Sequence, residues 1–345
     1  MDKKVIFAVA GSGKTTYIVN SLSKEKRTLI VTYTIANCEN LKNKILNKFG
    51  GVWPTNLTVM TYFKFLYNFC YKPLLSDRVR ARGITYEGPQ NYYNQKKNNN
   101  FYLTSNNYFY SNRLSLFLLE LEGVFSEIQE RLTKYFDAFV IDEVQDIAGR
   151  DFDFLIKLMQ IDINQLYVGD FFQHTYDTSR DGNVNKSLFD DQKKYETRFI
   201  QNGFVCDTST LVNSWRCSKS VCKYVSDMLG IEIHSNRTDD SKITFVKTLD
   251  EAKMIIGDSS IVKLHYQGAS NFGLCHRNWG DTKGEDHYSD VCVVLNKKTV
   301  ALAKANKLNQ LSPLTRNKLY VAITRARNNV YFMDDILFNQ CVPNS

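Results

Sequence analysis

The sequence predicts an α/β protein with two domains, each built around a parallel β-sheet. Short apolar, β-branched runs alternate with amphipathic stretches along most of the chain, which is typical of strands joined by crossover helices. The chain has 345 residues, and a single hydrophobic core rarely grows beyond about 250 to 300 residues. The first apolar run leads into a glycine-rich loop and a helical pattern, a unit typical of parallel α/β sheets.

The expected strands fall in two series. The first series covers residues 5–9, 28–33, 57–60, 138–141 and 164–168. The second series covers residues 209–212, 243–247, 260–264, 291–295 and 329–333, with helices expected at 218–229 and 313–326. We therefore predict a first domain over residues 1–77 and 113–200, and a second domain over residues 201–345.

Residues 78–112 interrupt the first domain and are predicted to form a surface insertion. Arg78, Arg80 and Arg82 precede a run rich in Asn and Tyr at residues 91–100. Aromatic rings interleaved with cations suit contact with a nucleic-acid strand. A low-complexity loop without such a role is the alternative interpretation.

Composition limits the class of protein further. The net charge of +8 favours a polyanionic partner without requiring one. No window approaches the ~20 apolar residues of a membrane span, and the first apolar run is too short for a secretion signal. The eight cysteines form no CxxC pair, and the spacing of histidines and cysteines fits no closed zinc site. We expect a reducing compartment: the cytoplasm of a prokaryotic or phage-infected cell, or the nucleus of a eukaryotic one.

A candidate phosphate-binding loop follows the first strand and comprises Gly11, Ser12, Gly13, Lys14, Thr15 and Thr16. Glycines let consecutive backbone N–H groups turn toward phosphate oxygens, and the following helix N-terminus adds partial positive charge. Lys14 is expected to reach the β- and γ-phosphates, and Thr15 to give its hydroxyl to Mg²⁺. Ala8 stands where the general GxxxxGK[ST] pattern has its first glycine. The loop alone predicts nucleoside-triphosphate binding and no particular reaction.

Two adjacent carboxylates, Asp142 and Glu143, follow the expected strand at 138–141. They would lie at the carboxyl edge of the sheet, where such folds bind ligands. Asp142 suits a hydrated magnesium ion, and Glu143 suits the role of general base toward an attacking water. After a buried strand in a chain with a phosphate loop, this interpretation outweighs that of a solvated acidic loop.

From this point the motifs resemble, in order, those of the UvrD/Rep-like superfamily 1 helicases. The matching segments are residues 28–34, 58–63, 168–173, 213–218, 283–284 and 319–327. The resemblance implies two tandem RecA-like (P-loop NTPase) domains without a large accessory insertion in the second. It also implies ATP and Mg²⁺ as cofactors and ATP-dependent movement on single-stranded DNA, in the 3′ to 5′ direction.

The resemblance implies roles for individual residues as well. Gln173 would sense the γ-phosphate, and Arg216 and Arg325 would join Glu143 as catalytic residues. Trp215 would stack on the nucleotide base, and three residues of the lysine–glycine motif would bind the nucleotide: Lys283, Gly284 and Asp286, the last with Glu285 as a rival. The nucleic-acid contacts would come from Tyr33, which resembles a base-stacking position, and from Thr34, Thr61, Tyr62 and Tyr176. Of these, Thr61 and Tyr62 are expected on a loop.

The sequence also departs from the family pattern. Four residues precede the first strand, which leaves no room for the family's upstream glutamine motif, so we expect weak selection of the nucleotide base. Thr178 and Ser179 occupy positions where the family usually has an aromatic residue and an arginine. Because no accessory domain is inserted, we expect good translocation, and unwinding that depends on a protein partner.

Three other functions are weighed against this one. An RNA helicase or translocase is the nearest, because nothing in the motifs reads a 2′-hydroxyl. A nucleotide-switched regulatory protein that binds nucleic acid is a second, although it would not need a complete hydrolytic set. A small-molecule kinase would leave the second domain unexplained.

Overall fold

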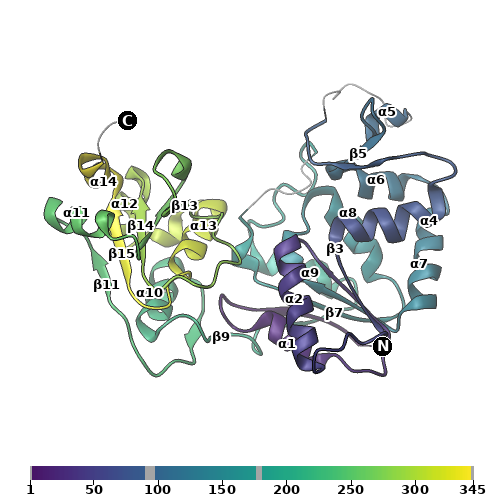
Figure 1. The fold of residues 1–345 in the computed structure, drawn as a ribbon, viewed down its shortest axis with the longest axis horizontal. Coiled ribbons are helices and arrows are strands. Elements are labelled where there is room, and N and C mark those ends of the chain that lie inside the picture. The colour runs from purple at the N-terminus through teal and green to yellow at the C-terminus, as the bar shows by residue number, and fades with distance from the viewer. Residues whose placement is uncertain (1, 90–97, 176–180, 343–345) are drawn as a thin grey trace. The chain divides into compact units, whose positions relative to one another are not determined.

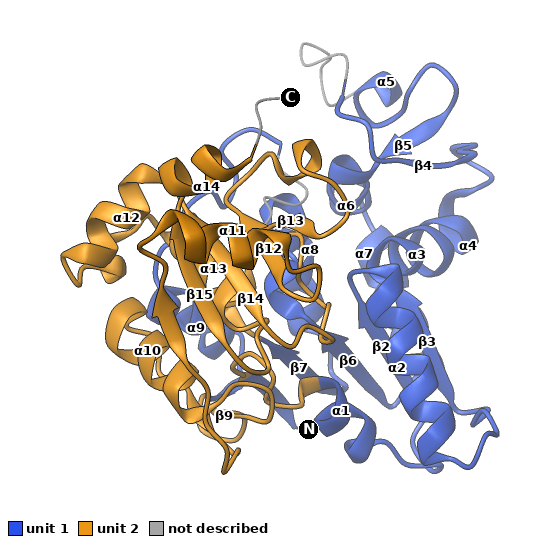
Figure 2. Cartoon of the chain, turned by 60° about the vertical axis from the view of Figure 1, so that its left-hand side comes forward, with its two compact units in different colours: residues 1–6, 15–169, 177–207 blue, residues 7–14, 170–176, 208–345 orange. Residues whose placement is uncertain are grey.

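The computed structural model describes residues 2–89, 98–175 and 181–342, and it divides into two compact units (Figure 1). The first unit comprises residues 1–6, 15–169 and 177–207 (Figure 2). The second comprises residues 7–14, 170–176 and 208–345. The phosphate loop thus groups with the second unit as far as Lys14, and with the first unit from Thr15 onward.

The first unit is built on a six-stranded sheet with the order β3-β2-β6-β7-β1-β8. Its strands are β1 (Lys3–Phe7), β2 (Thr28–Thr32), β3 (Leu57–Thr61), β6 (Ala138–Asp142), β7 (Asn164–Gly169) and β8 (Val205–Asp207). β2 pairs in parallel with β3 and β6, β6 with β7, and β1 with β8. The strands β2 and β6 are almost entirely buried, as expected for a parallel sheet covered on both faces.

The helices of the first unit fill the intervals between these strands. The larger ones are α1 (Lys14–Ser21), α2 (Ile35–Lys48), α6 (Ser111–Glu120), α7 (Val124–Tyr135), α8 (Gly149–Met159) and α9 (Gln192–Ile200). A short helix α3 (Tyr62–Lys64) continues into the π-helix η1 (Phe65–Tyr71) and then into α4 (Lys72–Leu75). A 3₁₀ turn η2 (Val144–Asp146) follows β6, and a second one, η3 (Phe171–Gln173), belongs to the second unit. Ring contacts running from Phe65 through Phe139 and Tyr167 to Phe199 join η1, the two central strands and α9.

The predicted insertion has structure of its own where it is described. β4 (Gly83–Thr85) pairs in parallel with β5 (Tyr108–Tyr110), and a short helix α5 (Asn99–Tyr102) precedes β5. Arg113, at the start of α6, is buried and forms an ion pair with Asp181 at 3.2 Å. Most of the predicted Asn-rich run, residues 91–97, lies outside the described residues, as do Tyr176, Thr178 and Ser179.

The second unit carries a five-stranded sheet with the order β11-β15-β14-β12-β13. Its strands, all paired in parallel, are β11 (Ile243–Phe245), β12 (Val262–His265), β13 (His276–Asn278), β14 (Val291–Leu295) and β15 (Val330–Asp334). A separate parallel pair joins β9 (Asn213–Ser214) to β10 (His234–Ser235). The helices are α10 (Lys219–Leu229), α11 (Leu249–Gly257), α12 (Lys297–Lys304), α13 (Pro313–Ile323) and α14 (Asp335–Cys341), with 3₁₀ turns η4 (Ala269–Asn271) and η5 (Leu308–Gln310).

The central strand β14 shows why this sheet must be covered on both faces. All five of its residues are buried. Val291, Val293 and Leu295 pack with residues of α10 and α13, whereas Cys292 and Val294 pack with residues of α11 and α14. Alternate side chains of a strand point to opposite faces, so each face of β14 contributes to a separate apolar cluster.

The expected strand at 209–212 is wrong. Those residues form a turn, and the strand lies earlier, at β8. The partner of β8 is β1, from the other end of the chain, and an ion pair of 2.7 Å between Lys4 and Asp207 reinforces the pairing. The first unit therefore continues to Asp207, beyond the predicted domain boundary at residue 200. Among the described residues, no helix is both long and apolar enough to cross a membrane.

Candidate nucleotide and nucleic-acid sites

Strand register in the first unit brings three polar strand ends together. Thr32 at the end of β2 pairs with Thr61 at the end of β3 and with Asp142 at the end of β6. Because the strands are parallel, the loops that follow them leave from one edge of the sheet. Tyr33, Tyr62 and Glu143 thus begin neighbouring connections.

The phosphate loop has the backbone of an anion-binding turn. Gly11 and Gly13 have φ angles of 70° and 88°, in the left-handed region that glycine adopts without cost. Ser12, between them, is buried, and Lys14, also buried, begins α1. Alternating left- and right-handed residues point successive N–H groups inward. The φ angles of Gly11 and Gly13 are therefore compatible with the predicted phosphate-binding turn.

The two predicted magnesium ligands lie together in the first unit. The hydroxyl of Thr15 donates a hydrogen bond to Oδ2 of Asp142 at 3.4 Å. Asp142 is only 2% exposed. A hydroxyl beside a buried carboxylate is an oxygen donor set of the kind that Mg²⁺ prefers, so these residues fit the ion. Thr16 is placed differently: it is exposed, and its hydroxyl accepts from Nζ of Lys44 at 3.2 Å.

Glu143 is held in an unusual conformation. Its φ angle is 61°, which is uncommon for a residue other than glycine and is typical of functional sites. Nε2 of Gln145 donates to its carboxylate at 2.6 Å. A Cβ atom at Gly169 would lie 2.3 Å from Oε1 of Gln145. Gln145 and Gly169 were not among the predicted site residues, although Gly169 lies within the strand motif at 168–173.

A buried hydrogen-bonded group in the second unit surrounds Gln173. Nε2 of Gln173 donates to Asp170 at 2.7 Å, and Asp170 also accepts from the hydroxyl of Tyr320 at 3.1 Å. The same hydroxyl accepts from the backbone N–H of Ala10 at 2.8 Å. Tyr320 therefore joins the phosphate loop to the carboxylate that holds Gln173. Asp170 and Tyr320 lie within the motif segments 168–173 and 319–327. No role was predicted for either of them, because their residue types alone indicate none.

The tip of the phosphate loop packs against the segment that carries Trp215 and Arg216. The N–H of Trp215 donates to the carbonyl of Gly11 at 2.9 Å. A Cβ atom at Gly11 would lie 2.7 Å from both Cβ of Arg216 and Oγ of Ser214, so only glycine fits there. Trp215 is 68% exposed. It is not part of the hydrophobic core, which leaves its face accessible to a planar ligand.

Asp286 brings the two predicted catalytic arginines together. Its carboxylate accepts from Arg216, and Oδ1 also accepts from Arg325 at 3.3 Å. Arg325 is fully buried and donates further to the carbonyls of Thr282 at 3.2 Å and Glu285 at 3.3 Å. Burial first, and the nearby charge of Arg216 second, lower the pKa of Arg325 to about 10, which leaves it charged at neutral pH.

The remaining residues of the lysine–glycine motif lie in a tight turn. The N–H of Lys283 donates to the carbonyl of Gly280 at 3.4 Å, and Gly284 has a φ angle of 86°. The carboxylate of Glu285, the rival of Asp286, accepts from the hydroxyl of Tyr288 instead of from the arginines. Of the two acidic residues, Asp286 is thus the one whose carboxylate contacts Arg216 and Arg325.

The predicted nucleic-acid residues of the first unit differ in accessibility. The ring of Tyr33 is partly exposed and stacks on that of Tyr62, with centroids 5.9 Å apart. Thr34 is exposed and caps α2 by accepting from the N–H of Asn37. The expected loop at Thr61 and Tyr62 is wrong, because Thr61 ends β3 and caps α3 directly, which leaves no loop between them. Tyr62 is 1% exposed, so its side chain offers no surface to a strand.

Comparison with known proteins identifies the fold. No protein-family model matches the chain, and no curated protein matches it. A solved structure of arterivirus nonstructural protein 10, a helicase, in complex with DNA matches with a TM-score of 0.51 and 17% identity over 98% of this chain. A crystal structure of arterivirus nonstructural protein 10, a helicase, matches with a TM-score of 0.51 and 16% identity over 99% of this chain.

The chain spans 62% of the length of each of these neighbours. At this level of identity the likeness concerns the fold. It confirms the predicted fold class, an α/β chain with two parallel sheets of the RecA-like kind. This structural likeness does not distinguish UvrD/Rep-like helicases from other helicases.

Proposed function

We propose that the chain is a nucleic-acid-dependent ATPase, a helicase or translocase that moves on a single strand. The observation that carries the proposal is the contact between the Thr15 hydroxyl and the buried Asp142 carboxylate, next to Glu143. A phosphate loop, a magnesium ligand pair and an adjacent carboxylate base are the parts that NTP hydrolysis needs. The helicase fold of the structural neighbours supports the same class of activity.

The phosphate loop would hold the nucleotide by its N–H groups and by Lys14, with Thr15 and Asp142 as ligands of Mg²⁺. The bound ion would neutralise charge on the phosphates during transfer. Glu143 would accept the proton of the attacking water, and its hydrogen bond from Gln145 fixes the direction of its carboxylate. Gln173, held by Asp170, would contact the γ-phosphate or the water that attacks it.

Arg216 and Arg325 would supply positive charge to the transferring group. Arginines in this role accelerate phosphoryl transfer by about 10³ to 10⁵. Both are oriented by Asp286, which supports a positioning role for that residue alongside the nucleotide contact that the family resemblance implies. Lys283 and Gly284 would lie near the nucleotide. The exposed ring of Trp215 would stack on any base, so we propose weak selection among nucleoside triphosphates.

For the strand, we propose DNA over RNA and the 3′ to 5′ direction of the UvrD/Rep-like family. Tyr33 would stack on a base, with backbone contacts from the neighbouring strand ends. One neighbour was solved with DNA, which supports a nucleic-acid substrate of that kind. Because only short elements interrupt the second unit's sheet, we also propose that efficient unwinding requires a protein partner.

Displacement of streptavidin from biotinylated strands tests both movement and direction. With ATP, we expect release from a 5′ biotin and little release from a 3′ biotin, because a motor that moves 3′ to 5′ meets the 5′ end. Release from the 3′ end alone would reverse the assigned direction. ATP hydrolysis without release from either end would favour the nucleotide-switched regulatory protein instead.

Parallel assays with DNA and RNA of one sequence separate the two substrates. Stimulation of hydrolysis by RNA at least as strong as that by DNA would favour an RNA motor.

A further inference from the structure

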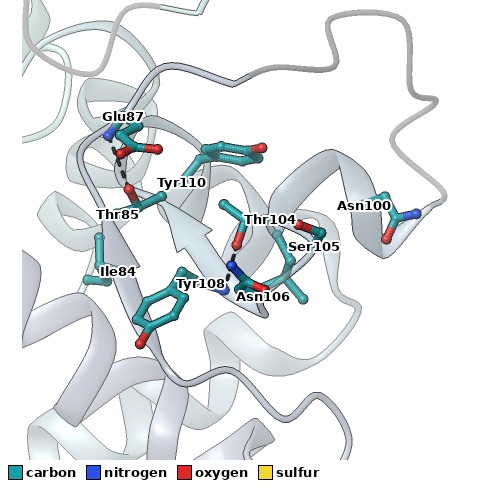
Figure 3. A pocket seen from close by; sticks show the side chains of 10 residues that line it. Ile84, Thr85, Glu87, Asn100, Thr104, Ser105, Asn106, Tyr108 and Tyr110 are labelled. Carbon is teal, nitrogen blue, oxygen red and sulfur yellow. Dashed lines mark hydrogen bonds between the residues drawn. The ribbon is translucent and has the colours of Figure 1, made fainter.

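The insertion of the first unit contains a pocket of about 460 Å³ that no part of the proposed motor uses (Figure 3). Its lining combines two tyrosine rings with short polar side chains: Thr85, Asn100, Thr104, Asn106, Tyr108 and Tyr110. Apolar surface with a few convergent hydrogen-bonding groups is typical of sites for small planar ligands, and the volume lies in their usual range. The pocket therefore has the size and the chemistry of a site for a flat, polar-edged group.

Hydrogen bonds fix the walls of this pocket. The pairing of β4 with β5 sets Gly83 opposite Tyr108 and Thr85 opposite Tyr110. The backbones of Thr104 and Tyr108 are joined by an N–H to carbonyl bond of 2.8 Å, and the Thr104 hydroxyl accepts from the N–H of Tyr108 at 3.1 Å. The N–H of Arg82 donates to the carbonyl of Asn107 at 2.8 Å. The site is preformed, which lowers the cost of binding.

A line of aromatic rings connects the pocket to the predicted strand site. The ring of Tyr33 contacts that of Phe63 at 5.5 Å, and Phe63 contacts the ring of Tyr86 edge-on at 5.3 Å. Tyr86 is 72% exposed and lies between two residues that line the pocket, Thr85 and Glu87. All of these residues belong to the first unit. Tyr86 itself does not line the pocket, but its exposed ring belongs to the same segment as two residues that do, and it contacts Phe63, which contacts Tyr33.

Positive charge on the segment that leads into the insertion favours contact with the phosphates of a strand, whereas, among the described residues, the one charged side chain that lines the pocket is Glu87. Arg78, Arg80 and Arg82 are exposed and lead directly into β4, which forms one wall of the pocket. Within the described part of the insertion, residues 78–89 and 98–112, Glu87 is the one carboxylate beside these three arginines. The hydroxyl of Tyr67 donates to the carbonyl of Ala81 at 2.9 Å and so holds the arginine-bearing segment against η1.

We propose that the pocket receives a base of the single strand, which runs from Tyr33 across Tyr86 into the insertion. The inference rests on the proposed function and adds a second base-binding site to it. Tyr86 and Tyr108 supply stacking surfaces, which every base accepts. The amides of Asn100 and Asn106 offer donors and acceptors to the edge of the base. The arginines hold the adjacent phosphates, and such contacts weaken with salt.

Binding of a fluorescein-labelled oligo(dT) to the full chain, followed by anisotropy, tests the stacking residues. We expect Tyr86→Ala and Tyr108→Ala each to weaken binding about tenfold, while Tyr86→Phe and Tyr108→Phe retain it, because the ring and not the hydroxyl stacks. Thermal unfolding of each variant checks that the fold persists. Equal affinity of both alanine variants and wild type would overturn the proposal.

A charge-matched pair of double variants tests the arginines. Arg80→Ala/Arg82→Ala should weaken binding and reduce its dependence on salt, since phosphate contacts release counterions. Lys193→Ala/Lys194→Ala removes the same charge from the exposed face of α9 and should change neither. An equal loss in both double variants would reduce the effect to net charge and overturn the assigned site.

Photocrosslinking of strands that carry 5-iodouracil locates the base directly, with DNA and RNA in separate arms. We expect crosslinked peptides that contain Tyr86 or Tyr108. If wild type binds the strand and hydrolysis responds to it, but crosslinks appear only elsewhere, the pocket proposal fails while the motor survives. If wild type binds neither DNA nor RNA, the proposed function fails, and the pocket proposal with it.

Discussion

The hydroxyl of Tyr320 accepts a hydrogen bond from the backbone N–H of Ala10 at 2.8 Å, although the two residues lie 310 positions apart. It also donates to Asp170 at 3.1 Å, the carboxylate that holds Gln173. The three contacts are buried in the second unit. They tie the backbone directly before the phosphate loop to the residue proposed to sense the γ-phosphate.

Replacing Tyr320 with Phe should therefore weaken nucleotide use more than folding. The loss of a hydrogen bond that leaves a buried N–H unsatisfied costs about 1 to 3 kcal/mol. We expect kcat/KM for ATP to fall about tenfold, mainly through a higher KM. Steady-state kinetics measures this, with strand affinity as the control. Unchanged kinetics with a lowered unfolding temperature would mean that the contact is structural only.

Asp286→Asn tests the shared carboxylate of the two arginines. Two guanidinium groups lie against Asp286, and its charge partly opposes the lowering of the pKa of Arg325 by burial and by the charge of Arg216. Without that charge, like charges would repel and the arginines would lose their fixed direction, so we expect kcat to fall at least tenfold. Asp250→Asn, an exposed carboxylate on α11, is the matched control. An increase in KM with unchanged kcat would instead indicate a ribose or phosphate contact.

Gly169→Ala tests the support of Glu143. The added Cβ would clash with Oε1 of Gln145 and lie 2.9 Å from Cγ1 of Val144, so these side chains must shift, and the hydrogen bond from Gln145 to Glu143 would be disturbed. We expect kcat to fall about tenfold and stability to fall by about 1 to 3 kcal/mol. Gln145→Ala should reproduce the lower kcat without the steric cost. Gly257→Ala, where an added Cβ meets nothing within 4 Å at the end of α11, should leave kcat unchanged and should not lower stability.

The stability of the second unit should depend on pH through His265. Burial first and His276 second lower the pKa of His265 to about 4. The ring contacts Phe272 and Phe338, and Nε2 lies 2.8 Å from Nδ1 of His276, whose own pKa is lowered by burial and by the charge of Lys263. The surroundings of His265 therefore disfavour its protonated form.

The sign of the effect follows from proton binding. Between pH about 6.5 and 4 the unfolded chain binds a proton at His265 and the folded chain does not, so stability falls as pH falls. Between pH 7.5 and pH 5 we expect a loss on the order of 2 kcal/mol. Urea midpoints measured by tryptophan fluorescence at pH 7.5 and 5 should differ less in His265→Gln than in wild type. An equal shift in both proteins would place the titrating group elsewhere.

Local pattern was sufficient to predict most of the sheet. β2, β3, β6, β14 and β15 lie within about a residue of their expected positions, because each is a mostly apolar run. β2, β6 and β14 are buried on both faces, whereas β3 and β15 are partly half-buried. Pattern failed at β8, a short edge strand whose structure depends on β1 at the far end of the chain. It also could not predict the elements of the insertion, where biased composition hides the period of the apolar residues.

The candidate site divides in the same way. The loop at Gly11–Thr15 and the pair Asp142 and Glu143 could be predicted because each follows a strand directly. Contacts of Tyr320 with Ala10 and of Asp286 with both arginines join distant residues, so no local signal reveals them. Tyr62 is the opposite case. Its position in a motif predicted a contact with the nucleic-acid strand, but packing buries its side chain.

Hydrolysis of ATP with and without a single strand tests the central claim most directly. Phosphate release should rise severalfold or more on addition of single-stranded DNA. Glu143→Gln should hydrolyse ATP more slowly by a factor of about 10² to 10⁴, which is the usual contribution of a general base. The variant should still bind nucleotide and strand. Glu130→Gln, an exposed glutamate on α7, should behave as wild type. Hydrolysis that ignores the strand, or that survives in Glu143→Gln, would contradict the account.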